Sequence, residues 1–147
     1  KDKKHVYVGD YIIPDADPNT FELLSGCYSK DKNYVYCTDG KLRELNPDTV
    51  KIIGDYAYDN GIMYILFQRI EGIDIDSFEV LKGLYSKDKN SIYYVNKKIE
   101  NVDMETFESF KNGYARDKNH VYLLGGIQKD LDPKTFEIPE KAVFIVN

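Results

Sequence analysis

The sequence has little of what metal, redox and nucleotide sites require. Its 147 residues include two cysteines and two histidines, and His5 and His120 are too far apart along the chain to form a local metal site. Neither histidine has a serine or cysteine neighbour at the spacing of an activated nucleophile. The glycine pair Gly125-Gly126 falls in a predicted turn and does not open a helix, so it predicts no nucleotide-binding loop. We therefore expect no catalytic, cofactor-binding or metal-ligating residues.

Long apolar runs and concentrations of positive charge are also missing. Without an apolar run of about 20 residues, the chain has no candidate transmembrane helix. The net charge of −5 comes from 25 acidic and 20 basic residues, which are interspersed without a basic stripe or a clustered arginine face. Nucleic-acid binding depends on such a concentration of positive charge. We expect neither a membrane span in this chain nor a nucleic-acid partner.

What the sequence does contain is a repeat. The stretch Tyr28–Tyr36 returns as Tyr85–Tyr93 and, with substitutions, as Tyr114–Tyr122. Its aspartate recurs every 28 or 29 residues, at Asp2, Asp31, Asp59, Asp88 and Asp117. A fixed period of this length is typical of repeats that bury their apolar faces against their neighbours. We predict one repeat domain over residues 1–147, with repeats at about 2–30, 31–58, 59–87, 88–116 and 117–147.

Each repeat is predicted to begin with a β-hairpin, because apolar and aromatic residues alternate on both sides of a polar Asp-Lys-Asn cluster. Gly61 replaces the asparagine of this cluster in one copy, which indicates a left-handed backbone at Asn33, Asn90 and Asn119 and a three-residue loop with a bulge. In that register two tyrosines face each other across every hairpin. The predicted pairs are Tyr28 with Tyr36, Tyr56 with Tyr64, Tyr85 with Tyr93, and Tyr114 with Tyr122.

The remaining face of the hairpin is predicted to pack against the next repeat. Its second strand carries an apolar residue in each copy, namely Val35, Met63, Ile92 and Val121. The first strand supplies a small residue, namely Ser29, Ala57, Ser86 and Ala115, which lets a neighbouring repeat come close to the backbone. This pattern predicts that successive repeats stack on one another.

A second turn is predicted at Asp39-Gly40, Asn96-Lys97 and Gly125-Gly126, followed by a short third strand. The strand ends at an Asp-Pro-x-Thr-Phe block such as Asp17–Phe21, where the aspartate can cap backbone N–H groups and proline suits the first position of a helical turn. We expect one helical turn or an Asx turn at this capping block. Its aromatic residue is expected to plug the seam between repeats.

Together these elements predict an all-β fold of about five three-stranded β-hairpin or meander repeats, stacked as an elongated array or solenoid. Propeller-like closure is the alternative, although 29 residues are few for a four-stranded blade, which usually needs about 40. Residues Ala142 to Val146 are predicted to form a terminal closing strand. Because the first repeat lacks its leading strand, we expect the sequence to be a fragment of a longer repeat protein.

Two residue patterns leave alternatives open. Cys27 and Cys37 fall opposite each other in the predicted register, so they form either a cross-strand disulfide or, as we favour, two small buried thiols. Acidic residues two positions apart can share a calcium ion, and they occur at Asp15/Asp17, Asp74/Asp76 and Asp130/Asp132. A calcium loop needs roughly six to eight oxygen ligands, and one aspartate of each pair already has the capping role, so we expect no metal here.

Aromatic rings can stack on sugars, which makes the tyrosines candidates for ligand contact. Nine of the 13 tyrosines occupy repeat positions and are predicted to pack in the core or at the seams. The other four are Tyr34, Tyr11, Tyr58 and Tyr94, and these are our candidate ligand-contact residues.

The motif Asp31-Lys32-Asn33-Tyr34-Val35-Tyr36, together with the block Asp17–Phe21, resembles the bacterial DKNYY repeat family over nearly the whole chain. Asp59-Asn60-Gly61 departs from the motif, and the first copy has Lys4 and His5. The resemblance implies a bacterial source and an exported or cell-envelope location rather than a cytoplasmic one. It implies no activity and no catalytic residues.

We therefore expect a non-enzymatic interaction or scaffold module of a bacterial envelope or exported protein, which binds an unknown protein or glycan without a cofactor. The alternatives are a dedicated glycan-binding module and a hydrolytic enzyme that uses acids from several repeats. Exposed non-consensus aromatic residues on one side would favour binding. Carboxylates that converge in a cleft with raised pKa values would favour the enzyme.

Overall fold

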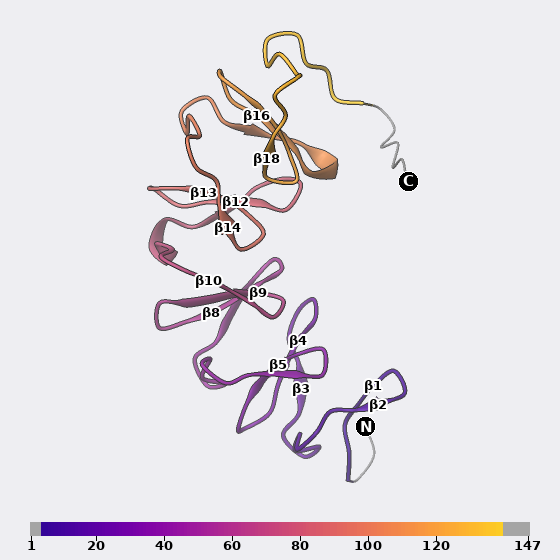
Figure 1. Ribbon diagram of the computed structural model, residues 1–147. Helices are drawn as coiled ribbons and strands as arrows, with labels where there is room; N and C mark the ends of the chain where they lie inside the picture. Colours follow the sequence, from indigo (N-terminus) through magenta and orange to yellow (C-terminus); the bar gives the residue numbers. More distant parts are fainter. Residues whose placement is uncertain (1–3, 140–147) are drawn as a thin grey trace. The chain divides into compact units, whose positions relative to one another are not determined.

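The computed structural model describes residues 4–139 and shows an all-β chain of short antiparallel strands (Figure 1). The strands form one two-stranded sheet and four four-stranded sheets, and no sheet closes into a barrel within this part of the chain. The predicted all-β class and the tandem repetition are confirmed. The chain divides into two compact units, called here unit 1, up to Ile75, and unit 2, from Asp76 onwards.

Unit 1 contains three sheets. The strands are β1 (Tyr7–Val8) and β2 (Tyr11–Ile12); β3 (Glu22–Leu23), β4 (Tyr28–Lys30), β5 (Val35–Cys37) and β6 (Gly40–Leu42); and β7 (Lys51–Ile53), β8 (Tyr56–Asp59), β9 (Ile62–Ile65) and β10 (Gln68–Ile70). Neighbouring strands in each sheet are consecutive in the sequence, so each sheet is a meander.

Unit 2 contains two sheets of the same order. The first has β11 (Glu79–Val80), β12 (Tyr85–Lys87), β13 (Ile92–Tyr94) and β14 (Lys97–Lys98), and the second has β15 (Glu108–Ser109), β16 (Tyr114–Arg116), β17 (Val121–Leu123) and β18 (Gly126–Ile127). Two short 3-10 turns complete the elements, η1 (Ile75–Ser77), which begins at the last residue of unit 1, and η2 (Lys111–Gly113).

The repeat has one strand more than predicted. The additional strand follows the capping block and forms β3, β7, β11 and β15. A left-handed residue two positions before the leading tyrosine connects it to the hairpin, and Gly26, Gly54, Gly83 and Asn112 occupy that position with φ between 58° and 68°. Four strands fit into 29 residues because each is only two to four residues long. The recurrent glycine is the sequence signal for this strand.

The predicted hairpin register is wrong by one residue. Tyr28 pairs with Cys37 and Ser29 pairs with Tyr36, and the other three hairpins have the same register. Because neighbouring residues of a strand point to opposite faces, Tyr28 and Tyr36 lie on opposite sides of the sheet. None of the four predicted tyrosine pairs forms.

The loop explains the shift in register. The Asp31 N–H donates to the Tyr34 carbonyl at 3.0 Å, and the Asp31 carboxylate accepts from the N–H groups of Asn33 and Tyr34 at 2.7 and 2.8 Å. This Asx turn closes a four-residue loop in which Asn33 is not left-handed. The predicted left-handed backbone is confirmed at Gly61, which has φ of 80°. Together with Asn60, which has φ of 46°, it forms a different, two-residue turn. Asn33 and Gly61 therefore serve different loops.

The second turn lies one residue earlier than predicted, at Thr38-Asp39, Val95-Asn96 and Leu124-Gly125. Its first residue is left-handed although it is not glycine, with φ between 51° and 55° in these three copies. Such a backbone is unfavourable, especially for the β-branched Thr38 and Val95. A hydrogen bond outside the strand ladder holds each turn: Thr38 donates to Cys27 O at 2.8 Å and Val95 to Leu84 O at 3.0 Å.

Both faces of the central hairpin are buried, and successive sheets within a unit share a core. In unit 1, Tyr28, Val35 and Leu42 of one sheet pack with Ala57 and Tyr64 of the next. In unit 2 the equivalent cluster contains Tyr85, Ile92, Ile99, Ala115 and Tyr122. The predicted stacking through small first-strand residues is confirmed inside each unit.

The leading tyrosine also joins successive sheets through its hydroxyl. Tyr28 Oη donates to the Asp55 carbonyl at 2.9 Å and accepts from the Leu66 N–H at 2.9 Å. In unit 2, Tyr85 Oη donates to the Gly113 carbonyl at 2.9 Å and accepts from the Gly125 N–H at 3.1 Å. The leading tyrosine is therefore a structural residue.

The aromatic residue of the capping block plugs a seam, as predicted. The Phe107 ring lies 5.5 Å from that of Tyr85 and 5.9 Å from that of Tyr122, so it contacts two successive sheets.

Cys27 and Cys37 are free thiols and are not directly opposite, because the register differs. Burial, followed by a hydrogen bond with Cys27, raises the pKa of Cys37 to about 12.

The predicted closing strand at Ala142 to Val146 lies outside the described residues. No helix within residues 4–139 is long and apolar enough to cross a bilayer.

Candidate binding site

The motif aspartate holds three parts of the repeat together. Asp31 is buried, and its Oδ1 accepts the loop N–H groups of Asn33 and Tyr34. Its Oδ2 accepts the Tyr36 hydroxyl at 2.8 Å and the Asp17 N–H at 2.8 Å. Since Asp17 belongs to the preceding capping block, one carboxylate connects the block, the loop and the second strand.

Asp117 makes the same connections in unit 2. It accepts from the N–H groups of Asn119 and His120 through Oδ1, and from Tyr122 Oη and the Asp103 N–H through Oδ2, at 2.7 to 2.8 Å. Asp59, in the copy with the tight turn, keeps only part of this network. It accepts the Asn46 N–H at 3.2 Å and the Thr49 hydroxyl at 2.8 Å, while the hydroxyl of Tyr64 donates to Glu44 instead.

The capping block is an Asx turn, as predicted, and it is tied to the following hairpin loop. Asp17 Oδ1 accepts the Asn19 N–H at 2.9 Å, and Thr20 Oγ1 accepts the Lys32 N–H at 3.2 Å. The Lys32 ammonium returns to Asp17 Oδ2 at 3.0 Å. The polar residues of the consensus are therefore engaged in building the repeat.

The hydrogen bonds keep the motif aspartates ionised. Burial raises the pKa of Asp31 and of Asp117, but the N–H groups of the capping block and the loop and the tyrosine hydroxyl lower it more. The pKa of each carboxyl is therefore below its usual value. A catalytic acid at neutral pH needs a raised pKa, so these two carboxylates do not suit the acid role in the hydrolase alternative.

We expect the free energy of unfolding to decrease once the pH falls below about 4. The folded pKa values of Asp31 and Asp117 are depressed, so their contribution is complete above the unfolded value of about 3.9 and is lost as the pH falls through the folded values. Urea midpoints measured at about pH 6, 4 and 2.5 test this expectation. A midpoint that stays constant down to about pH 2.5 would contradict it.

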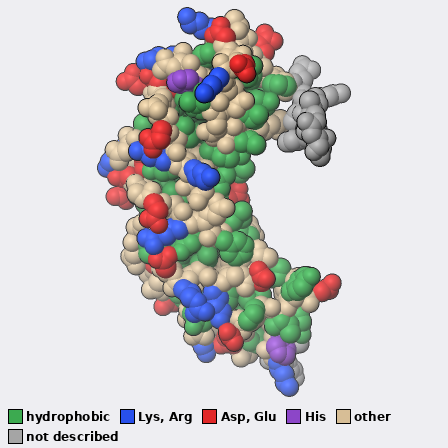
Figure 2. All heavy atoms as spheres, in the orientation of Figure 1, with side chains coloured by type: hydrophobic (Ala, Val, Ile, Leu, Met, Phe, Trp, Pro, Cys, Tyr) green, Lys and Arg blue, Asp and Glu red, His purple; other side chains and the backbone are tan. Residues whose placement is uncertain are grey.

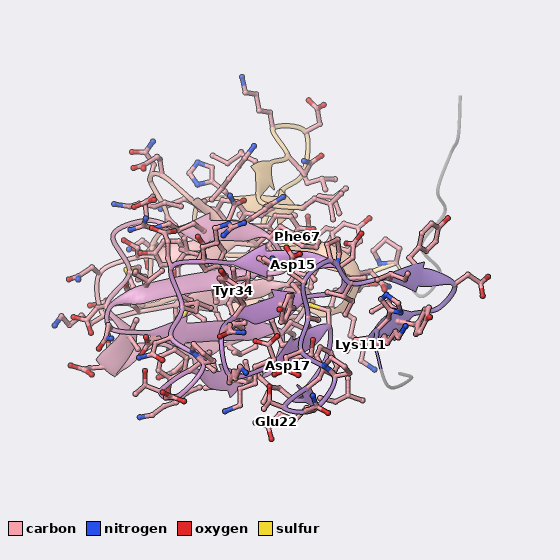
Figure 3. All side chains as sticks on the ribbon, turned by 90° about the horizontal axis from the view of Figure 1, so that it is seen from below. Asp15, Asp17, Glu22, Tyr34, Phe67 and Lys111 are labelled. Atoms are coloured by element: carbon pink, nitrogen blue, oxygen red, sulfur yellow. The ribbon has the colours of Figure 1, made fainter. Side chains whose placement is uncertain are left out.

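Tyr34, the first candidate residue and labelled in Figure 3, is half-buried and packs against two cationic side chains. Lys41 Nζ lies 4.6 Å and Arg43 Cζ 5.6 Å from the centre of its ring. Lys41 also forms an ion pair with Asp15 at 2.8 Å. The Tyr34 ring is therefore partly covered by side chains of its own unit.

The other candidate tyrosines lie in different environments. Tyr11 on β2 is 76% exposed and stands at the end of a two-stranded sheet. Tyr94 packs edge-on against Tyr85 at 5.0 Å and belongs to the core of unit 2. Tyr58 lines a pocket of unit 1. Within unit 1, Tyr34 and Tyr58 lie beside the hairpin loops of two different sheets, and Tyr11 follows the turn of a third.

The first acidic pair, Asp15 and Asp17, has lysine partners within unit 1. Asp15 pairs with Lys41 and Asp17 with Lys32. Within residues 4–139, no three side chains of histidine, cysteine, aspartate or glutamate lie close enough to hold a metal ion.

The pocket beside Tyr58 has a volume of about 490 Å³. The capping turn contributes Asp48 and Thr49, the strands contribute Lys51 and Tyr58, and the tight turn contributes Asp59 and Asn60. The buried Asp59 carboxylate accepts hydrogen bonds from the Thr49 hydroxyl at 2.8 Å and from Asn60 Nδ2 at 3.2 Å. Lys51 and Tyr58 are directly opposite across β7 and β8, so their side chains share one face.

The other three four-stranded sheets carry an ion pair where this sheet has Lys51 and Tyr58. The pairs are Glu22 with Lys30 at 3.0 Å, Glu79 with Lys87 at 3.0 Å, and Glu108 with Arg116 at 2.9 Å. In the last sheet the equivalent pocket has a volume of about 250 Å³. The Asp48 and Lys51 side chains are exposed, the Tyr58 side chain is half-buried, and all three line the pocket. They are therefore available to a ligand.

Comparison with known proteins agrees with this repeat geometry. The model of the DKNYY family matches three segments, residues 1–58, 56–101 and 85–145, which together cover almost the whole chain. No curated protein and no solved structure matches it.

Proposed function

This chain belongs to the DKNYY family, and we propose that it is a non-enzymatic repeat scaffold of a bacterial envelope or exported protein. In this proposal the consensus residues build the repeats, and residues that depart from the consensus bind a partner.

The observation that carries the proposal is the use of the motif carboxylates. Asp31 and Asp117 are buried, accept four hydrogen bonds each and have lowered pKa values. A carboxylate that is fully hydrogen-bonded within the fold is a poor catalytic acid or base. The conspicuous acids of the sequence thus support a scaffold rather than a hydrolase.

The surface charge supports a partner other than nucleic acid. Figure 2 shows acidic and basic side chains interspersed on the visible face of each unit, without a patch of one sign. Exposed ion pairs, such as Lys87 with Glu79 and Arg116 with Glu108, neutralise several of the cations locally. Binding to a phosphate backbone requires a concentrated positive face.

Co-sedimentation with purified bacterial peptidoglycan sacculi tests the proposal. We expect the chain to pellet with the sacculi, and the supernatant to gain no reducing sugars or free amino groups over time. Release of such products in proportion to protein would contradict the non-enzymatic assignment. Failure to pellet would contradict binding to this envelope polymer.

A further inference from the structure

We propose that the pocket of Asp48, Lys51, Tyr58 and Asn60 binds a sugar unit that carries a carboxylate. This inference rests on the proposed binding function and specifies the ligand class for one site. Three departures from the repeat consensus meet at this pocket: a cation at the position of the usual glutamate, an aromatic residue at the position of the usual cation, and the tight Asn60-Gly61 turn.

Because the three departures from the consensus meet at one pocket, they favour a binding site over unrelated surface substitutions. Elsewhere the two facing positions neutralise each other, as Glu79 and Lys87 do at 3.0 Å. Lys51 and Tyr58 cannot form that ion pair, so an ammonium and a phenol ring remain side by side at a pocket of about 490 Å³. The tight turn also removes the loop lysine that in the last repeat, Lys118, lines the smaller pocket.

The chemistry of the pocket fits an acidic saccharide. The half-buried Tyr58 ring offers an apolar face to the C–H groups of a sugar ring, and it lies on a strand that fixes its position. The Asp48 carboxylate and the Asn60 carbonyl can accept hydrogen bonds from sugar hydroxyls. The Lys51 ammonium is the cation that would pair with a carboxylate on the ligand. The Asp59 carboxylate, which also lines the pocket, is already hydrogen-bonded by Thr49 and Asn60, so this part of the pocket is organised before a ligand arrives.

Two tetrasaccharides with the same backbone form the test. One alternates N-acetylglucosamine with N-acetylmuramic acid, whose lactyl group carries a carboxylate, and the other is chitotetraose, which lacks it. Isothermal titration should show tighter binding of the acidic tetrasaccharide to the unmodified chain. Tyr58→Ala should weaken that binding at least about tenfold, which corresponds to about 1.4 kcal/mol. Lys51→Met should remove the preference between the two sugars.

Two further variants separate a binding defect from a folding defect. Lys51→Glu combined with Tyr58→Lys restores the ion pair of the other repeats, so this double variant should keep its thermal stability and lose binding. Leu23→Ala changes an exposed apolar side chain outside the pocket and should bind as the unmodified chain does. Equal binding of the acidic sugar by the double variant, or equal binding of both sugars by the unmodified chain, would overturn the inference. If the titrations contradict the pocket inference but the chain still pellets with sacculi, the proposed function stands. If the chain also fails to pellet, the proposed function is contradicted as well.

Discussion

Replacing Asp117 by asparagine is expected to lower the free energy of unfolding of unit 2 by about 2–4 kcal/mol. The carboxylate accepts four hydrogen bonds, two on each oxygen. An asparagine can satisfy the loop N–H groups with its carbonyl, but its NH2 group then faces the Asp103 N–H, which is also a donor. One buried donor is left without an acceptor, and the charge-assisted bonds are lost. Urea unfolding of the chain, followed by tyrosine fluorescence, measures the change.

A matched surface variant controls for the loss of charge. Glu105 is an exposed carboxylate in the capping block that precedes Asp117, and Glu105→Gln should change stability by no more than about 0.5 kcal/mol. The Asp117→Asn variant should also lose less stability than the unmodified chain when the pH is lowered below about 4, because its side chain no longer titrates. Equal losses for Asp117→Asn and Glu105→Gln would show that the carboxylate is not a structural junction.

The repeat period and the core positions were predictable, whereas the hairpin register was not. The continuous apolar and aromatic residues of β5 and β9 predict strands that are covered on both faces, and this prediction needs no knowledge of the loop. Register depends on the loop, and here two different loops give the same register. Asp31 closes its loop through its carboxylate, whereas Asn60-Gly61 closes a shorter loop through its backbone. Aligning Asn33 with Gly61 assumes one loop geometry for both.

The candidate site was found only in part for a related reason. Tyr58 was selected because it stands outside the tyrosine consensus, which is a property of the sequence alone. Lys51 was not selected, because the strand that carries it, β7, was absent from the predicted repeat. Without that strand, the cross-strand pairs such as Glu22 with Lys30 cannot be compared between repeats. The different pair at Lys51 and Tyr58 therefore cannot be recognised from the sequence. Gly54 and its equivalents were the available signal for the missing strand.

Replacing Gly83 by alanine is expected to cost more than about 3 kcal/mol. Gly83 has φ of +68°, and a Cβ at this position would lie 2.2 Å from the Phe110 carbonyl oxygen. The left-handed backbone alone costs an alanine about 1–2 kcal/mol. The contact adds to this cost because it is with main chain, and the Phe110 N–H is itself bonded to the Tyr114 carbonyl at 2.8 Å. Relief of the clash would require the two sheets of unit 2 to separate at this turn. Urea unfolding provides the measurement.

Gly72→Ala isolates the contribution of that close approach. Gly72 has the same φ of +68°, but a Cβ there would meet nothing within 4 Å. Its replacement therefore carries the backbone cost alone, about 1–2 kcal/mol. The difference between the two variants measures how closely the turn after β11 is packed against the chain between β15 and η2. Similar losses in both variants would mean that successive sheets of unit 2 can move apart freely at Gly83, and that the tyrosine hydroxyls and the shared core alone hold them together.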